Sequence, residues 1–167
     1  LDELRKPPLK VEYFAGIYGR MHRGIRPHPD FITEKSLELL DGIRFAFLCF
    51  DDAPAKVKLI GYLEAQDIPF IDVGLQVLKK ERGLTGSLRV TRSRPQKRDH
   101  FRRQVPLNED QVPNEYDENI QIAELNALNA TLAVIRWKRL MRYYVDQQGE
   151  HQSRYTIDGN VIGNEEF

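Results

Sequence analysis

The 167-residue chain has little cysteine, no excess charge of either sign and no long apolar run. Its one cysteine, Cys49, excludes an intrachain disulfide and zinc sites built from cysteine pairs. Its 25 basic residues balance its 25 acidic ones, so net charge does not indicate nucleic acid or a membrane as the partner. No apolar run reaches the roughly 18 residues that cross a bilayer, and residues 1–10 lack the apolar centre of a secretory signal. A soluble, cytoplasmic protein without zinc is expected.

The length and the apolar content favour a folded domain. A chain of 167 residues fits the usual size of one domain, and a hydrophobic content of 41% is enough for a buried core. The first residue is Leu1, and residues 1–8 read like the approach to a helix inside a larger fold. A fragment of a longer protein is therefore expected.

Two helices are predicted before the first strand. The first helix begins near Pro8, because proline is favoured in the first helical turn. A shorter helix follows, with Thr33 as its N-cap and Gly42 just past its end. The first helix has apolar residues at helical spacing, which are Val11, Phe14, Ile17 and Tyr18.

The centre of the chain predicts an α/β fold. Residues 44–50 form a continuous apolar run typical of a strand that is buried on both faces. A helix over 54–65, burying Val57, Ile60 and Leu63, leads to a second buried strand over 67–77. This order is typical of a right-handed parallel crossover. A third strand is predicted over 83–91.

The second half contains a long loop, a long helix and a hairpin. Residues 93–119 lack apolar periodicity and are first basic, then acidic, which indicates a functional or unstructured loop. The helix predicted over 119–141 is apolar on most faces and is expected to be buried. Asp158-Gly159 predicts a two-residue hairpin turn in the last segment, 146–167.

Two adjacent aspartates follow the first strand. Asp52 precedes Ala53-Pro54 and is expected to cap the next helix. Asp51 ends a buried strand, and ligands of open α/β sheets bind beyond the carboxyl ends of the strands. Position alone leaves two interpretations of Asp51 open, a structural one and a role in holding magnesium that bridges phosphate oxygens.

The ordered set of motifs resembles the ThiF/MoeB/HesA family, the adenylating domains related to ubiquitin-activating enzymes. "FAFLCFDDAPAKVKLIGYL" is similar to the family's strand, Asp-Asn-type pair and helix. "IPFIDVG" and "LTGSLRV" follow in the family's order, with Pro69, Gly74 and Gly86 in place. Upstream, "PPLKVEYF" looks like the lysine-bearing helix start, and "ENIQIAELNALNATLAVIRWKRL" is similar to the long buried helix downstream.

The resemblance implies a Rossmann-like, mostly parallel sheet flanked by helices, and an ATP-dependent reaction. Asp51 and Lys10 would be catalytic, and together with Asp52 they would bind ATP, with Asp51 supporting Mg²⁺. The substrate would be the C-terminal carboxylate of a ubiquitin-like or sulfur-carrier protein, which attacks the α-phosphate to give an acyl-adenylate. A homodimer is the expected assembly.

Several parts of the family pattern are missing. The chain has no G-x-G-x-x-G turn, and the family's ribose-binding acidic residue and Arg–Gln pair have no counterpart. Residues 1–145 are therefore interpreted as an adenylyltransferase domain that lacks its N-terminal nucleotide-binding portion and is inactive alone, with 146–167 as an extension. The loop carries no catalytic cysteine, and mid-strand Cys49 is expected to be a buried structural thiol.

The basic part of the loop has three interpretations. Its arginines contact a partner protein, they bind nucleic acid, or they are simply solvated. The partner-binding reading supports an alternative function, a catalytically degenerate relative that acts as a protein-binding module. Nucleic acid is the less favoured partner. The residues assigned to partner binding are Arg92, Arg94, Arg98 and Arg102.

Overall fold

The computed structural model describes residues 7–105, 107 and 120–165, and the chain divides into two compact units, Leu1–Leu39 and Leu40–Phe167. In the first unit the helix α2 (Lys10–Tyr18) follows Pro8, as predicted. None of its residues is buried, so its apolar positions do not form the inner face of a core. The short 3₁₀ helix η1 (Ser36–Leu40) follows Thr33, whose hydroxyl accepts from the Ser36 amide at 3.4 Å.

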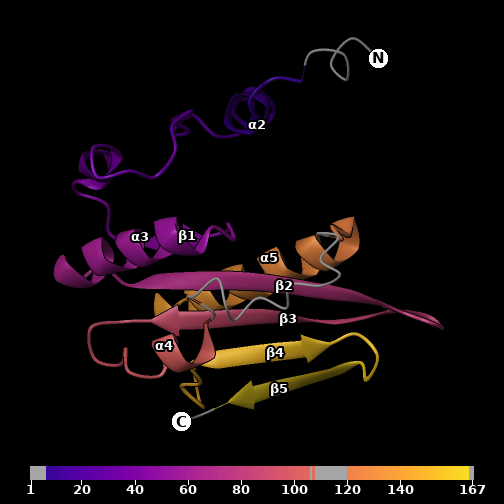
Figure 1. Ribbon diagram of the computed structural model, residues 1–167. Coiled ribbons are helices and arrows are strands. Elements are labelled where there is room, and N and C mark those ends of the chain that lie inside the picture. The colour runs from indigo at the N-terminus through magenta and orange to yellow at the C-terminus, as the bar shows by residue number, and fades with distance from the viewer. Residues whose placement is uncertain (1–6, 106, 108–119, 166–167) are drawn as a thin grey trace. The chain divides into compact units, whose positions relative to one another are not determined.

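The second unit contains a five-stranded, mostly antiparallel open sheet flanked by helices (Figure 1). Its strands are paired in sequence order, and only β1 and β2 run parallel. The predicted parallel crossover is present, because α3 (Ala53–Ala65) connects β1 to β2. The mostly parallel sheet expected from the sequence is not what the described strands show. The strands are β1 (Ala46–Leu48), β2 (Phe70–Lys80), β3 (Gly83–Ser93), β4 (Gln152–Thr156) and β5 (Val161–Glu165).

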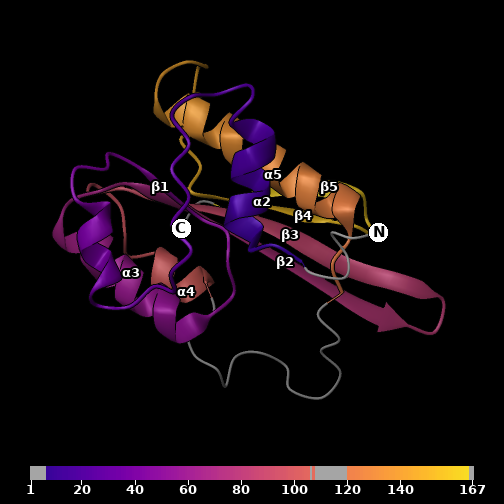
Figure 2. The ribbon, with the colours of Figure 1, turned by 90° about the horizontal axis from the view of Figure 1, so that it is seen from above.

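Helices cover both faces of this sheet (Figure 2). The helix α5 (Ala123–Leu140) packs through Ala133 against Ile71 and Val90. On the opposite face, Phe70 meets Phe101 of the short helix α4 (Phe101–Gln104) edge to face, with ring centroids 5.0 Å apart. Because strand residues alternate between faces, Asp72 shares a face with Phe70, and α3 lies over it.

Three burial predictions were wrong, for related reasons. The strand β1 is at the edge of the described sheet and Phe47 is 41% exposed, so β1 is not buried on both faces. In α3, Val57 is 47% exposed whereas Lys56 is buried. In α5 only Asn129, Ala133 and Arg136 are buried, so this helix buries one narrow stripe.

The predicted hairpin is confirmed, with a longer turn. Thr156 pairs with Val161, so the turn between β4 and β5 spans 157–160 and includes Asp158-Gly159. The carboxylate of Asp158 accepts from the Thr85 hydroxyl at 2.8 Å, which ties the turn to β3. No helix in the part of the chain that the structure describes is both long and apolar enough to cross a membrane.

Candidate functional site

The carboxyl end of β1 carries the two aspartates that the sequence singled out. Asp52 caps α3, as predicted, because its carboxylate accepts from the Ala55 amide at 2.8 Å. Its carbonyl accepts from the Lys56 amide at 2.9 Å, and Pro54 has no N–H. The start of α3 thus offers few amides to an anion. An exposed carboxylate there, that of Asp51, favours a cation instead.

Behind this end of β1 lies a buried trio formed by Lys56, Asp72 and Arg89. The ammonium of Lys56 is 2.7 Å from one carboxylate oxygen of Asp72, and Nη2 of Arg89 is 2.7 Å from the other. Asp72 has 0% exposed surface, so both cations compensate a carboxylate that is fully removed from water. The trio joins α3, β2 and β3, and Asp72 is the register partner of Leu48, the last residue of β1.

Neighbouring residues fix the guanidinium of Arg89. Its Nη1 donates to the hydroxyl of Thr91 at 2.9 Å, and that hydroxyl donates to Gln152 at 3.0 Å. A Cβ atom at Gly74 would lie 2.8 Å from Nη2 of Arg89, so any other residue there would displace this guanidinium from its present position. The sequence identified Gly74 by resemblance alone, and its physical role is this close approach.

The thiol of Cys49 is exposed, so the prediction of a buried structural cysteine was wrong. Successive residues of an extended chain point to opposite sides, and the side chain of Leu48 is buried in the core, so that of Cys49 points away from it. The pKa of the thiol is raised, first because the surrounding protein removes part of its hydration and second because Asp72 is negative. A raised pKa disfavours the thiolate, so this position is poorly suited to a nucleophile.

Lys10, the second residue predicted to be catalytic, is the exposed first residue of α2. It belongs to the first unit, whereas Asp51 belongs to the second. The expected approach of Lys10 to a nucleotide held at Asp51 therefore stays a prediction.

The arginines assigned to partner binding are mostly engaged within the chain. Arg98 contacts Asp67 at 3.1 Å and Arg102 contacts Glu64 at 2.6 Å, so both tie the basic segment to the end of α3. Arg92, the residue before the last one of β3, is 2% exposed and pairs with Asp146 at 2.9 Å. The fourth residue, Arg94, shows no ion pair or side-chain hydrogen bond within the described residues.

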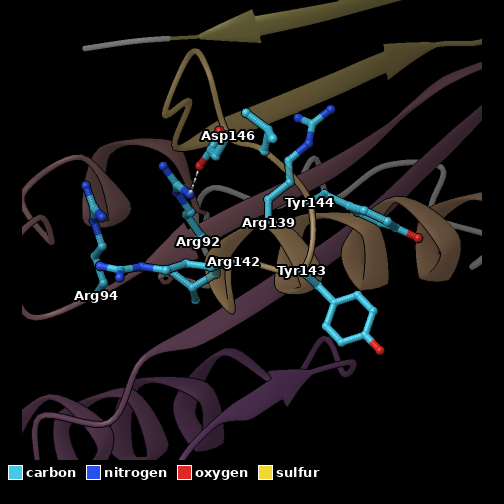
Figure 3. Close-up of a pocket in the computed structure, with 9 residues that line it drawn as sticks. Arg92, Arg94, Arg139, Arg142, Tyr143, Tyr144 and Asp146 are labelled. Carbon is cyan, nitrogen blue, oxygen red and sulfur yellow. Dashed lines mark hydrogen bonds and ion pairs between the residues drawn. The ribbon is translucent and has the colours of Figure 1, made fainter.

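Arg92 and Arg94 line a pocket at the end of β3, with a volume of about 450 Å³ (Figure 3). The last turn of α5 and the segment after it complete the lining. Arg94 and Arg142 lie on one side in Figure 3, and the rings of Tyr143 and Tyr144 on the other. Arg92 pairs with Ile71, which packs against α5, so this pocket lies on the α5 face of the sheet, whereas the trio lies on the α3 face. The remaining lining residues are Arg139, Leu140, Val145 and Asp146.

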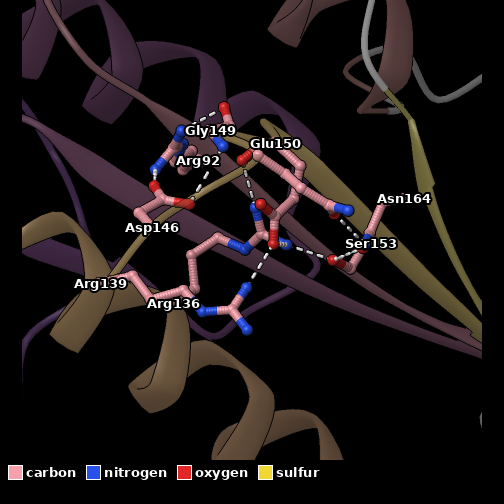
Figure 4. Close-up of polar contacts among 9 residues, drawn as sticks. Arg92, Arg136, Arg139, Asp146, Gly149, Glu150, Ser153 and Asn164 are labelled. Atoms are coloured by element: carbon pink, nitrogen blue, oxygen red, sulfur yellow. Dashed lines mark hydrogen bonds and ion pairs between the residues drawn. The ribbon is translucent and has the colours of Figure 1, made fainter. Parts of the chain in front are cut away.

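A buried polar network supports the wall of this pocket (Figure 4). Glu150 is 2% exposed and accepts from Arg139 at 2.5 Å, with Arg136 at 3.3 Å. Arg136 also donates to the Glu150 carbonyl and to the Ser153 hydroxyl. Its pKa is lowered to about 10, first by desolvation, with Arg92 and Arg139 acting in the same direction. The network therefore concentrates positive charge behind the pocket.

Sequence reasoning missed the trio and the network. A signal for the trio exists, since Asp72 interrupts the apolar stretch "IPFIDVG" and a carboxylate inside a buried strand requires a cation. Lys56 and Arg89 have no comparable signal in the sequence. A scan against protein-family models and a search of curated proteins find no match to this chain.

Proposed function

We propose that the chain is part of an ATP-dependent adenylyltransferase of the ThiF/MoeB/HesA kind. It would activate the C-terminal carboxylate of a ubiquitin-like or sulfur-carrier protein as an acyl-adenylate. The proposal depends on one observation, the exposed carboxylate of Asp51 just beyond β1, the strand that pairs in parallel with β2 across the α3 crossover. Ligands of α/β sheets bind at that position.

The residues present fit a magnesium ion carried by a nucleotide. Mg²⁺ is commonly held by one or two carboxylates together with substrate phosphates. Asp51 supplies such a carboxylate, and Asp52 lies beside it while its own oxygen caps α3. Magnesium would neutralise charge on the phosphates during attack at the α-phosphate, which is the main demand of this reaction.

The buried trio would act as a rigid support for Asp51. It connects α3 with β2 and β3 through two contacts of 2.7 Å, so the start of α3, which follows Asp51, is held against the sheet by buried charges. Lys10 would steady the ATP phosphates as a point charge. These roles assign substrate contact to Asp51 and Lys10, and positioning to Lys56, Asp72 and Arg89.

The test is ATP–pyrophosphate exchange by the full-length protein with candidate ubiquitin-like or sulfur-carrier partners. Asp51→Asn is expected to lower exchange at least about 100-fold, because it removes the metal-binding charge and leaves α3 intact. Asp52→Asn is the matched control for charge and fold, since asparagine also caps helices. It is expected to keep the melting temperature and to lower exchange less than Asp51→Asn does.

A second candidate is a degenerate relative that binds protein without chemistry. It is favoured by the lack of a glycine-rich phosphate turn in the whole sequence. ATP binding distinguishes the two: absence of exchange, with ATP binding equal in wild type and Asp51→Ala, would contradict the enzymatic proposal. Partner binding that survives Lys10→Ala with Asp51→Ala would then support the binding module.

A further inference from the structure

The pocket at the end of β3 holds more positive charge than its surroundings compensate. Five guanidinium groups line it or lie directly behind it, and only two carboxylates, those of Asp146 and Glu150, face them. Three positive charges are therefore in excess within the described residues. The guanidinium groups are those of Arg92, Arg94, Arg136, Arg139 and Arg142.

Two of these arginines are available for a ligand. Neither Arg94 nor Arg142 shows an ion pair or a side-chain hydrogen bond among the residues that the structure describes. The Nε atoms of Arg92 and Arg94 are buried N–H donors without a hydrogen-bond partner there. Buried donors are nearly always satisfied in proteins, and the described residues supply no acceptor for these two.

The backbone at Arg142 gives an independent indication. The residue has a φ of +60° and lies one past the C-cap of α5, where the Tyr143 amide donates to the Lys138 carbonyl at 2.7 Å. This is the Schellman arrangement, in which glycine is strongly preferred at the left-handed position. Arginine there is strained, and its guanidinium lines the pocket. Strain kept at a pocket wall points to function.

We propose that this pocket binds the phosphate group of a small ligand through Arg94 and Arg142. A phosphate carries close to two negative charges and accepts forked hydrogen bonds from guanidinium groups, which matches the excess charge better than a single carboxylate does. The pocket volume of about 450 Å³ lies within the range of small-molecule sites. Inorganic phosphate, pyrophosphate and a mononucleotide share this chemistry.

Nucleic acid fits these observations less well. A strand-binding groove needs a continuous row of available cations. The other arginines of the basic segment are engaged, because Arg98 pairs with Asp67, Arg102 with Glu64 and Arg103 with Asp99. Available charge is thus concentrated in the pocket.

The test is calorimetric titration of the full chain with phosphate, pyrophosphate and AMP in phosphate-free buffer. Arg94→Gln and Arg142→Gly are each expected to weaken binding at least about tenfold. Arg82→Gln removes the same charge from the exposed turn between β2 and β3 and is the matched control. It is expected to leave the affinity unchanged.

Arg142→Gly also separates binding from folding. Glycine relieves the left-handed strain, so this variant is expected to melt roughly 2–4 °C higher while it binds less. Tighter binding of AMP than of phosphate would indicate that Tyr143 or Tyr144 contacts the adenine base. Equal affinities would indicate that the site contacts the phosphate group alone. The proposal is overturned by equal affinities in wild type, Arg94→Gln and Arg142→Gly, by an absence of binding at millimolar ligand, or by binding of single-stranded RNA only.

Discussion

Asp72 is the residue whose environment differs most from its expected one. It has no exposed surface, and its two oxygens each meet a cation at 2.7 Å. Asp72→Ala would leave two cations buried without a carboxylate, so we expect a loss of about 3–5 kcal/mol in the free energy of unfolding. Lys56→Met leaves Asp72 paired with Arg89 and is expected to cost less. Urea denaturation measures the free energy of unfolding of both variants. A loss for Lys56→Met that equals or exceeds the loss for Asp72→Ala would contradict the assignment of Asp72 as the centre of the trio.

The lowered pKa of His151 allows a prediction of how the stability of the protein depends on pH. Its pKa is lowered to about 4, first by desolvation and then by the positive charges of Arg92, His100, Arg94 and Lys97. Since the unfolded chain binds the proton at a pKa near 6.5, it carries more protons than the folded chain between these values. Stability is therefore complete above about pH 6.5 and falls as the pH drops toward 4. Because part of the ring stays in water, we expect a total loss of only about 1 kcal/mol.

Thermal melts of wild type and His151→Asn across pH 4 to 7.5 test this sign. The variant is expected to have a shallower decline, though not a flat one, because the pKa of His100 is lowered too. A wild-type melting temperature that rises as the pH falls below 6.5 would contradict the prediction.

At the scale of elements, the sequence predicted what local chemistry determines. Asp52 before Ala53-Pro54 is a capping pattern, and the cap is present. Three other local patterns also lie at the ends of elements: Pro8 before α2, Thr33 before η1, and the Asp158-Gly159 pair in the turn between β4 and β5. Sheet direction and burial depend on which elements meet, which a single sequence does not state. That is why the mostly parallel sheet, the burial of Val57 and the all-round burial of α5 were predicted wrongly.

The hairpin of β2 and β3 allows a prediction with an internal control. A Cβ at Gly86 would lie 2.2 Å from the backbone oxygen of Gln76, whereas a Cβ at Gly61, in α3, meets nothing within 4 Å. We expect Gly86→Ala to destabilise the protein by about 1–3 kcal/mol, because the strands must separate. Gly61→Ala is expected to stabilise it by about 0.5–1 kcal/mol, because alanine favours helix. Chemical denaturation of both variants measures the difference, and a neutral Gly86→Ala would refute the close approach.

At the scale of the whole molecule, half of the candidate site was visible in the sequence. The position of Asp51 after a strand and before a capped helix follows from local pattern. Arg89 and Asp72 are 17 residues apart and meet because β2 and β3 pair in register, which puts Gly74 opposite Arg89. The phosphate pocket needed the end of β3 to come near the end of α5. Such long-range juxtapositions have no local signal.

Two truncations test how the chain is divided. The buried apolar residues of the described structure all fall in the sequence range from Leu48 to Ala133, and α2 buries none of its residues. Residues 40–167 alone are therefore expected to unfold cooperatively at nearly the melting temperature of the whole chain.

A chain ending at residue 145 loses β4, β5 and the partners Asp146 and Glu150, so Arg92 and Arg136 remain buried without carboxylates. We expect it to show no cooperative transition by circular dichroism. A stable, cooperative 1–145 chain would instead support 146–167 as a separable extension and would contradict the structural role assigned here to the Arg136–Glu150 network.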